Sequence, residues 1–252
     1  ERRWRAHTGT APRATTVSEV ARCWGVIPAA GAGVRMGHSQ PKQHVLLGGK
    51  TLLQRSLQAL LGLPGMQGVV IAFAPDDPRA ADYRDTDERV RIVQGGAQRA
   101  DSVLAALHYL QKIAYNDDWV LVHDAARPCL AAADGERLVT QVVAKGCGGL
   151  LAEPVVDTLK RVDADGYVQA TVDRRGLWRA QTPQMFALGQ LRSVLAAALA
   201  DGVEITDEAS AMEWGGHPVL VVPGSPSNFK VTVPGDLELA AFYLGINREG
   251  QA

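Results

Sequence analysis

The sequence predicts an α/β fold with a mostly parallel sheet that is covered by helices on both faces. Three observations support this prediction. Apolar segments of strand length alternate with amphipathic segments of helical period, and no internal repeat or low-complexity linker interrupts the chain. In addition, 252 residues of which 46% are hydrophobic can fill a sizeable core. We therefore expect one domain over residues 23–252, preceded by a flexible basic tail over residues 1–22.

The individual elements follow from local patterns. Short runs that are mostly apolar and rich in strand-forming residues predict strands, in chain order, at 24–28, 68–74, 90–93, 119–123, 148–152 and 218–222. Apolar residues at helical spacing predict helices at 51–61, 97–113, 134–145, 187–200, 206–214 and 235–244. Thr51 is suited to cap the first of these helices, because its hydroxyl can accept a hydrogen bond from a free backbone N–H.

One segment breaks the alternation of strands and helices. Residues 155–181 have the polar alternation of two strands around an Asp-Gly turn at 165–166, which predicts a hairpin. A two-stranded ribbon is weakly stable alone and needs a partner surface. Two arrangements therefore remain open: the hairpin projects as a dimerisation arm, or it folds back on its own sheet.

Composition excludes several classes of protein. The 26 basic and 27 acidic side chains nearly cancel, whereas a dedicated nucleic-acid-binding domain carries a basic excess. No apolar run comes near the roughly 18 residues that a membrane span requires. The three cysteines fit neither a disulfide framework nor a zinc pattern. We therefore expect a cytoplasmic protein with no nucleic-acid or membrane partner.

The first 22 residues differ from the rest, since they carry five arginines against two acidic residues. They lack the apolar centre of a secretory signal. An extended bacterial N-terminus is the favoured interpretation, and the remnant of a plastid-type transit peptide is the alternative.

Loops that follow strands are the places to look for a site, because ligands of open parallel sheets bind beyond the carboxyl ends of the strands. The loop 28–37 is rich in small residues, which let backbone N–H groups approach an anion, and Arg35 and Lys42 add cations. It matches neither dinucleotide-binding fingerprint nor P-loop, because Met36 and His44 stand where glycines are required. Phosphate binding is favoured over a tight turn with solvated cations.

Two further loops complete this set. Gly95-Gly96 opens a helix that carries Ser102, which suits either anion binding or an ordinary strand-to-helix turn. Asp124 follows a strand, where a carboxylate contacts a ribose hydroxyl or a magnesium ion, and we favour this role over capping of the next turn. Its neighbour His123 is assigned to the core. Without a Ser-His-Asp or Cys-His set, the residues indicate a nucleotide-handling enzyme rather than an acyl-transfer enzyme.

The same residues carry a resemblance to a known family. The segment Pro28-Ala29-Ala30-Gly-x-Gly-x-Arg35-Met36 with Pro41-Lys42-Gln43 resembles the nucleotide-binding loop of nucleotidyltransferases. An ordered set of later motifs resembles one branch of them, the 2-C-methyl-D-erythritol 4-phosphate cytidylyltransferases of non-mevalonate isoprenoid biosynthesis. These motifs are Gly95-Gly96 to Arg99-x-x-Ser102, His123-Asp124-Ala-Ala-Arg127-Pro128, Asp157-Thr158, Thr171-Val-Asp173-Arg174, Thr206-Asp-Glu-Ala-Ser210 and Lys230-Val-Thr232.

The resemblance implies a Rossmann-like domain and a homodimer joined by the 155–181 arm. It implies that CMP passes from CTP to 2-C-methyl-D-erythritol 4-phosphate, whose own phosphate is the nucleophile, as pyrophosphate leaves. It also implies Mg²⁺, held mainly by the triphosphate, with the direct protein ligands unknown.

The resemblance implies three sets of site residues, which overlap. The catalytic residues would be Arg35, Lys42, Arg174 and Lys230. CTP would be bound by Pro28, Ala29, Ala30, Gly31, Gly33, Gly96, Arg99, Ser102, Asp124 and Ala125. The acceptor would be bound by Asp124, Arg127, Thr158, Arg174, Thr206 and Lys230, with Thr158 and Arg174 reaching across from the second subunit.

Two alternatives stay open at this point. Ribitol 5-phosphate cytidylyltransferase is a sister branch with the same loops and a different acceptor. A non-catalytic CTP-binding sensor is the alternative from another class, and the residues assigned to an acceptor argue against it.

Overall fold

The computed structural model describes residues 21–31, 41–84 and 86–246. The expected tail lies outside these ranges except for its last two residues. Gly33 and Arg35, two of the candidate site residues, also lie outside them.

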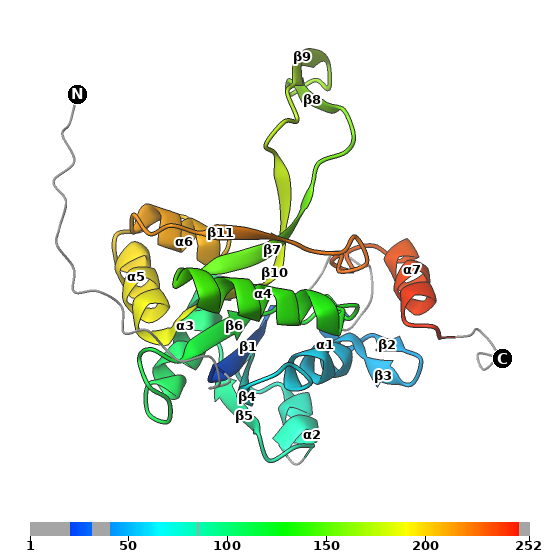
Figure 1. Ribbon diagram of the computed structural model, residues 1–252. Helices are drawn as coiled ribbons and strands as arrows, with labels where there is room; N and C mark the ends of the chain where they lie inside the picture. Colours follow the sequence, from blue (N-terminus) through cyan, green and yellow to red (C-terminus); the bar gives the residue numbers. More distant parts are fainter. Residues whose placement is uncertain (1–20, 32–40, 85, 247–252) are drawn as a thin grey trace, which may run out of the picture.

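Seven strands form one sheet in the order β11-β7-β10-β6-β1-β4-β5 (Figure 1). The strands are β1 (Cys23–Ala29), β4 (Met66–Phe73), β5 (Val90–Gln94), β6 (Trp119–Val122), β7 (Gly149–Pro154), β10 (Trp178–Ala187) and β11 (Leu220–Pro223). Strands β6, β1, β4 and β5 run parallel, as do β7 and β11, whereas β10 is antiparallel to both of its neighbours. The predicted α/β fold with a mostly parallel sheet is thus confirmed.

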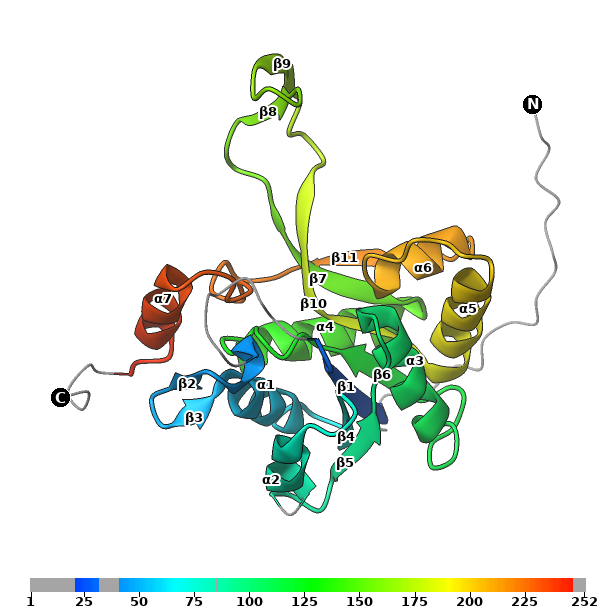
Figure 2. The same cartoon turned by 180° about the vertical axis from the view of Figure 1, so that it is seen from behind.

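Helices cover both faces of this sheet (Figures 1 and 2). One face carries α1 (Leu52–Leu61), α2 (Ala81–Arg84) and α4 (Ala132–Lys145), and the other carries α3 (Arg99–Leu110), α5 (Leu188–Ala200) and α6 (Glu208–Trp214). Because strand side chains alternate between faces, Ile27 packs toward α1 and α4 while Val26 packs toward α3 and α5. All six predicted helices are present within a few residues of their expected ends.

The last helix, α7 (Gly235–Tyr243), lies beside the short strands β2 (Leu46–Leu47) and β3 (Lys50–Thr51) at one end of the molecule. Thr51 caps α1 as predicted, since its hydroxyl accepts from the Gln54 N–H at 3.0 Å while the Gln54 side chain accepts from the Thr51 N–H at 2.8 Å. Two short 3₁₀ turns, η2 (Lys42–His44) and η3 (Pro78–Ala80), complete the elements. Among the residues that the structure describes, no helix combines the length and apolarity of a membrane span.

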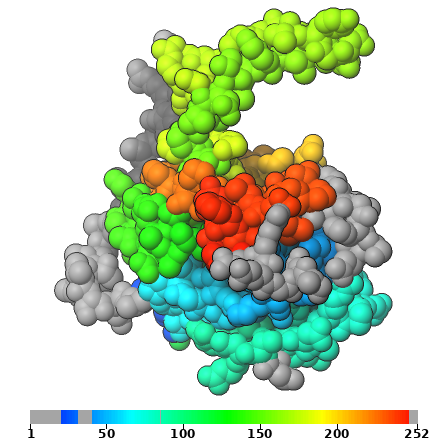
Figure 3. Space-filling view, turned by 90° about the vertical axis from the view of Figure 1, so that its right-hand side faces the viewer, coloured from blue at the N-terminus to red at the C-terminus, as the bar shows by residue number. Residues whose placement is uncertain are grey.

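The predicted hairpin consists of β8 (Leu159–Val162) and β9 (Val168–Val172), which pair antiparallel around Gly166, whose φ is +88°. It forms a sheet of its own and stands away from the body of the molecule rather than folding back over the main sheet (Figures 1 and 3). The segment is therefore available for contacts beyond its own chain.

Strand β10 is the strand of the main sheet that the sequence analysis did not predict, and the short elements β2, β3 and α2 were not predicted either. Its first residues, from Trp178, were expected to belong to the hairpin, and no strand was expected at 182–187. Local patterns hide it because three buried polar side chains, Gln181, Thr182 and Gln184, interrupt the apolar run. Their hydrogen-bond partners are remote in the sequence, so their burial is tolerated only in the folded chain.

Candidate active site

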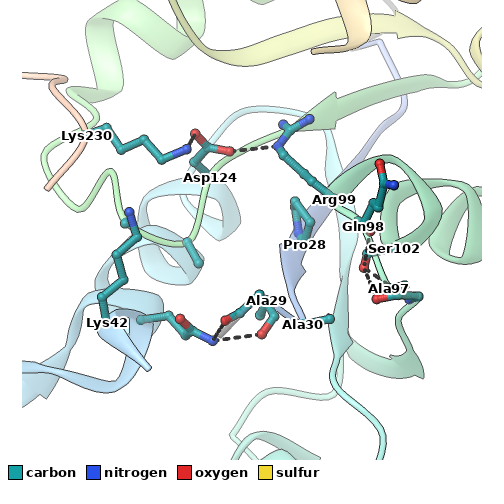
Figure 4. A pocket seen from close by; sticks show the side chains of 15 residues that line it. Pro28, Ala29, Ala30, Lys42, Ala97, Gln98, Arg99, Ser102, Asp124 and Lys230 are labelled. Atoms are coloured by element: carbon teal, nitrogen blue, oxygen red, sulfur yellow. Dashed lines mark hydrogen bonds and ion pairs between the residues drawn. The ribbon is translucent and has the colours of Figure 1, made fainter. Parts of the chain in front are cut away.

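A pocket of about 250 Å³ lies where the loops after β1, β5 and β6 converge (Figure 4). In the sheet, β4 and β5 follow β1 on one side, whereas β6 lies on its other side. The pocket therefore lies at the switch point of the sheet, where the strand order reverses. It is lined by Pro28, Ala29, Ala30, Gly31, Lys42, Gln43, Gly96, Ala97, Gln98, Arg99, Ser102, Asp124, Ala125, Ala126 and Lys230. We call it the first pocket.

The loop after β1 is held by Gln43. This buried side chain donates from Nε2 to the carbonyl oxygens of Ala29 and Gly31, at 2.9 and 3.0 Å. Because Lys42 is the preceding residue, the same contact ties the 3₁₀ turn η2 to the edge of the pocket. Lys42 donates from Nζ to the Val231 carbonyl oxygen at 3.2 Å.

The loop after β5 depends on Ser102. Its hydroxyl accepts from the Gly96 N–H at 3.2 Å and donates to the Gln98 carbonyl at 3.1 Å. A Cβ atom on Gly96 would come within 2.3 Å of the Asp101 Cβ, so this close turn requires glycine. The backbone at Gly96 is thereby held at the pocket wall.

Asp124, after β6, is surrounded by cations. Its Oδ1 accepts from Arg99 Nε at 3.1 Å, and its Oδ2 is 2.8 Å from Lys230 Nζ and 3.7 Å from Arg127 Nε. Burial alone would raise the pKa of Asp124, but Arg99, Lys230 and Arg127 outweigh it and hold that pKa far below its ordinary value. Asp124 is therefore an anion whose two oxygens are both engaged.

Arg99 bridges two carboxylates. Beyond Asp124, its two terminal nitrogens bind Glu208 Oε1 and Oε2 at 2.6 and 3.0 Å. Burial lowers the pKa of Arg99, but Glu208 and Asp124 more than compensate and raise it above its ordinary value. This bidentate geometry keeps the guanidinium in one orientation.

His123 anchors the loop that carries Asp124. The Thr182 hydroxyl donates to His123 Nδ1 at 2.9 Å and accepts from the Asp124 N–H at 3.0 Å, while His123 Nε2 donates to the Arg127 carbonyl at 3.0 Å. Burial lowers the pKa of His123 to about 4, so the ring is neutral at pH 7. The expectation that His123 belongs to the core agrees with its complete burial.

A second pocket of about 210 Å³ adjoins the first. It is lined by Arg99, Asp124, Arg127, Ala180, Gln181, Thr182, Gln184, Thr206, Asp207 and Lys230. Arg99, Asp124 and Lys230 line both pockets and so form their common wall. Two small molecules in these pockets would thus meet the same three charged side chains.

The structure brings most of the candidate site residues to these two pockets. The first pocket is lined by Pro28, Ala29, Ala30, Gly31, Lys42, Gly96, Arg99, Ser102, Asp124, Ala125 and Lys230, and the second is lined by Arg127 and Thr206 with the common wall. Thr158 and Arg174 line neither pocket. Both are exposed at the base of the hairpin, where Arg174 donates to the Val156 carbonyl oxygen.

The described part of the chain holds no group of three or more His, Cys, Asp or Glu side chains arranged to bind a metal ion. Asp124 is the acidic residue among the described residues that line the first pocket, and cations already occupy its oxygens. A metal in this pocket would therefore depend on oxygen ligands from a bound molecule.

Sequence reasoning did not identify Gln43, Thr182 and Glu208 as parts of the site. Gln43 and Glu208 lie inside motifs that were recognised, but nothing local shows what their side chains contact. Thr182 lies in β10, which was not predicted. In each case the partner is at least 12 residues away along the chain.

The chain is similar to a set of known proteins. The family model described as IspD, 2-C-methyl-D-erythritol 4-phosphate cytidylyltransferase, matches residues 23–246. A protein of that name from Pseudomonas putida is 52% identical over 217 residues, which cover 85% of this chain and 92% of the relative. The protein of that name from Pseudomonas syringae pv. tomato matches to the same extent, at 52% identity over 217 residues.

Two solved structures are also similar to the chain. A crystal structure of 4-diphosphocytidyl-2C-methyl-D-erythritol synthase superposes with a TM-score of 0.78 at 38% identity, covering 89% of this chain and 99% of the other. The 2-C-methyl-D-erythritol 4-phosphate cytidylyltransferase of Francisella tularensis has a TM-score of 0.77 at 33% identity, covering 88% and 100%.

Proposed function

The chain belongs to the 2-C-methyl-D-erythritol 4-phosphate cytidylyltransferase family, and from this premise we propose how its two adjoining pockets transfer CMP from CTP to 2-C-methyl-D-erythritol 4-phosphate. The observation that carries the proposal is the common wall of Arg99, Asp124 and Lys230. A transfer between two substrates needs both of them beside one set of charges, so that the reacting atoms are held in line.

CTP is assigned to the first pocket. Small residues from Pro28 to Gly31 leave backbone groups open to a nucleotide, and Lys42 supplies a cation at the same edge. The turn at Gly96, held by Ser102, offers backbone groups to the base on the other side. Arg35 and Gly33 are proposed to complete the contacts to the triphosphate.

The acceptor is assigned to the second pocket. Arg127, Arg99 and Lys230 surround a region where a phosphate monoester finds opposite charge. The Thr206 hydroxyl, and the lone pairs that the cations leave unused on the Asp124 carboxylate, offer partners for hydroxyl groups. Lys230 is proposed to guide the acceptor phosphate toward CTP, because its ammonium group borders both pockets.

The proposed chemistry is a single in-line displacement. An oxygen of the acceptor phosphate forms a bond to the α-phosphorus of CTP. The bond between the α-phosphorus and the oxygen that bridges it to the β-phosphorus breaks, and pyrophosphate leaves with that oxygen. A phosphate monoester is ionised at neutral pH, so the reaction needs charge stabilisation rather than a general base. Lys42 and Arg35 are proposed to supply it on the triphosphate.

Mg²⁺ is proposed to enter with the triphosphate. The donor set fits this mode of binding and not a protein cage, because Asp124 is already held by Arg99 and Lys230. When bound, the ion would neutralise charge on the phosphate oxygens.

The hairpin is proposed to join two subunits into a homodimer. Tyr167, Val156 and Val168 on it are 74%, 68% and 61% exposed, so the hairpin carries apolar side chains that a second chain could cover. In the dimer, Thr158 and Arg174 would reach the partner's second pocket, which accounts for their distance from the pockets of their own chain.

Pyrophosphate release with CTP and Mg²⁺ tests the proposal, with 2-C-methyl-D-erythritol 4-phosphate and ribitol 5-phosphate compared as acceptors. Release with the first acceptor alone is expected. A preference for ribitol 5-phosphate would move the chain to the sister activity. CTP binding without turnover on either acceptor would favour the sensor.

A further inference from the structure

Glu208 is the buried carboxylate nearest the common wall that the proposed function does not use. It is 1% exposed, lies at the first position of α6, and holds both terminal nitrogens of Arg99. The third guanidinium nitrogen of Arg99, Nε, binds Asp124 (Figure 4). Glu208 therefore fixes the orientation of the guanidinium, and this orientation determines where Nε contacts Asp124.

The start of α6 is firmly placed. Asp207 caps the helix by accepting from the Ser210 N–H at 2.9 Å. Gln184 of β10 binds both sides of this turn, donating to Asp207 Oδ2 and accepting from the Ala209 N–H, each at 2.8 Å. Glu208 is thus fixed to the central sheet and has little freedom to follow Arg99 if Arg99 moves.

We propose that Glu208 is a positioning residue for the acceptor: by fixing Arg99 it keeps the Asp124 carboxylate turned toward the second pocket. This inference rests on the proposed function of that pocket. Without the Glu208 charge, the freed end of Arg99 would turn to Asp124, the other carboxylate that Arg99 already binds. Both oxygens of Asp124 would then bind Arg99 in a bidentate pair, and Asp124 could no longer accept hydrogen bonds from the hydroxyl groups of the acceptor.

The effect should fall on the acceptor more than on CTP. A change at Glu208 leaves the loops at 28–31 and 96–98 of the first pocket in place. Among the described residues, no hydrogen bond joins these loops to Glu208. Arg99 and Asp124 line the first pocket as well, but they make up a larger share of the second, which is also lined by Thr206 and Asp207 just before α6. A selective change in acceptor affinity is therefore the signature of positioning, whereas general damage would affect both substrates.

The test is a double-mutant cycle on the full chain, with pyrophosphate release measured against each substrate in turn. The variants are Glu208→Gln, Arg99→Lys and the double variant, because a lysine retains the charge but lacks the planar fork that binds both Glu208 oxygens while Nε binds Asp124. Glu213→Gln is the matched control: it removes the same charge from an exposed position of the same helix. Glu208→Asp, which keeps the charge but shortens the side chain, replaces Glu208→Gln if that variant does not fold.

We expect Glu208→Gln to raise the acceptor KM about tenfold and the CTP KM by less than about threefold, and to have little further effect when Arg99 is already lysine. An unchanged acceptor KM, equal increases for both substrates, or a full effect in the Arg99→Lys background would each overturn the proposal. An unsubstituted chain without turnover would instead overturn the proposed function, and this inference with it.

Discussion

Lowering the pH from about 7.5 to about 5 is expected to cost the fold about 2 kcal/mol through His123 alone. The neutral ring accepts a hydrogen bond from the Thr182 hydroxyl and donates one to the Arg127 carbonyl. A proton on Nδ1 would remove the acceptor for Thr182, whose oxygen also holds the Asp124 N–H. Acid would therefore loosen the loop that carries Asp124.

The sign and size follow from linkage. Burial lowers the pKa of His123 in the folded chain from 6.5 to about 4, so the unfolded chain takes up the proton first as the pH falls. The contribution of His123 to the free energy of unfolding is present in full above pH 6.5 and is lost progressively as the pH falls to 4. The total loss is about 3 kcal/mol, of which about 2 kcal/mol has gone at about pH 5.

Urea unfolding of the unsubstituted chain and of His123→Gln at both pH values measures this contribution. Near pH 7.5, His123→Gln should have a lower free energy of unfolding than the unsubstituted chain. Near pH 5, this difference between the two proteins should be smaller by about 2 kcal/mol. His108→Gln, on the exposed face of α3, is the matched control. The reasoning would be refuted if the stability difference between His123→Gln and the unsubstituted chain changed with pH no more than the difference for His108→Gln.

Three further outcomes are expected. Lys42→Ala should lower kcat by about 10²-fold or more and change KM less, as for other charge-stabilising groups, and an unchanged kcat in the pyrophosphate assay would remove Lys42 from the mechanism. Mixing Arg174→Ala with Lys42→Ala protein should restore part of the activity through hybrid dimers, and no recovery despite demonstrated subunit exchange would argue against a shared site. Gly96→Ala should lower the free energy of unfolding by about 1–3 kcal/mol, since its Cβ would collide with Asp101, whereas Gly235→Ala meets open space and serves as the control in thermal melts.

Much of the fold was predictable because its signals are local. The parallel strands β1, β4, β5 and β6 are short apolar runs, and α1 shows its helical period together with a capping Thr51. Periodicity predicts such elements because an apolar strand or stripe must be buried wherever the chain goes. The loops that form the first pocket were predictable for a related reason, since parallel strands bring their carboxyl ends to one edge of the sheet.

The second pocket was only partly predictable. Lys230 and Thr206 were identified through a resemblance, not through any pattern of charge or spacing. Gln184 and Thr182 look like interruptions of a strand until their partners on α6 and at His123 are known. Glu208 looks like a helix-start carboxylate that water could solvate equally well.

The sequence by itself determined the kind of most elements and which loops follow the parallel strands, because both depend on neighbours within a few residues. Only the tertiary structure decided that β10 runs antiparallel between β6 and β7, and that Arg99 meets a carboxylate 109 residues further on. The physical reason is the same for both. A buried polar group or charge is stable only beside its partner, and that partner is chosen by the packing of the whole chain rather than by its neighbours in sequence.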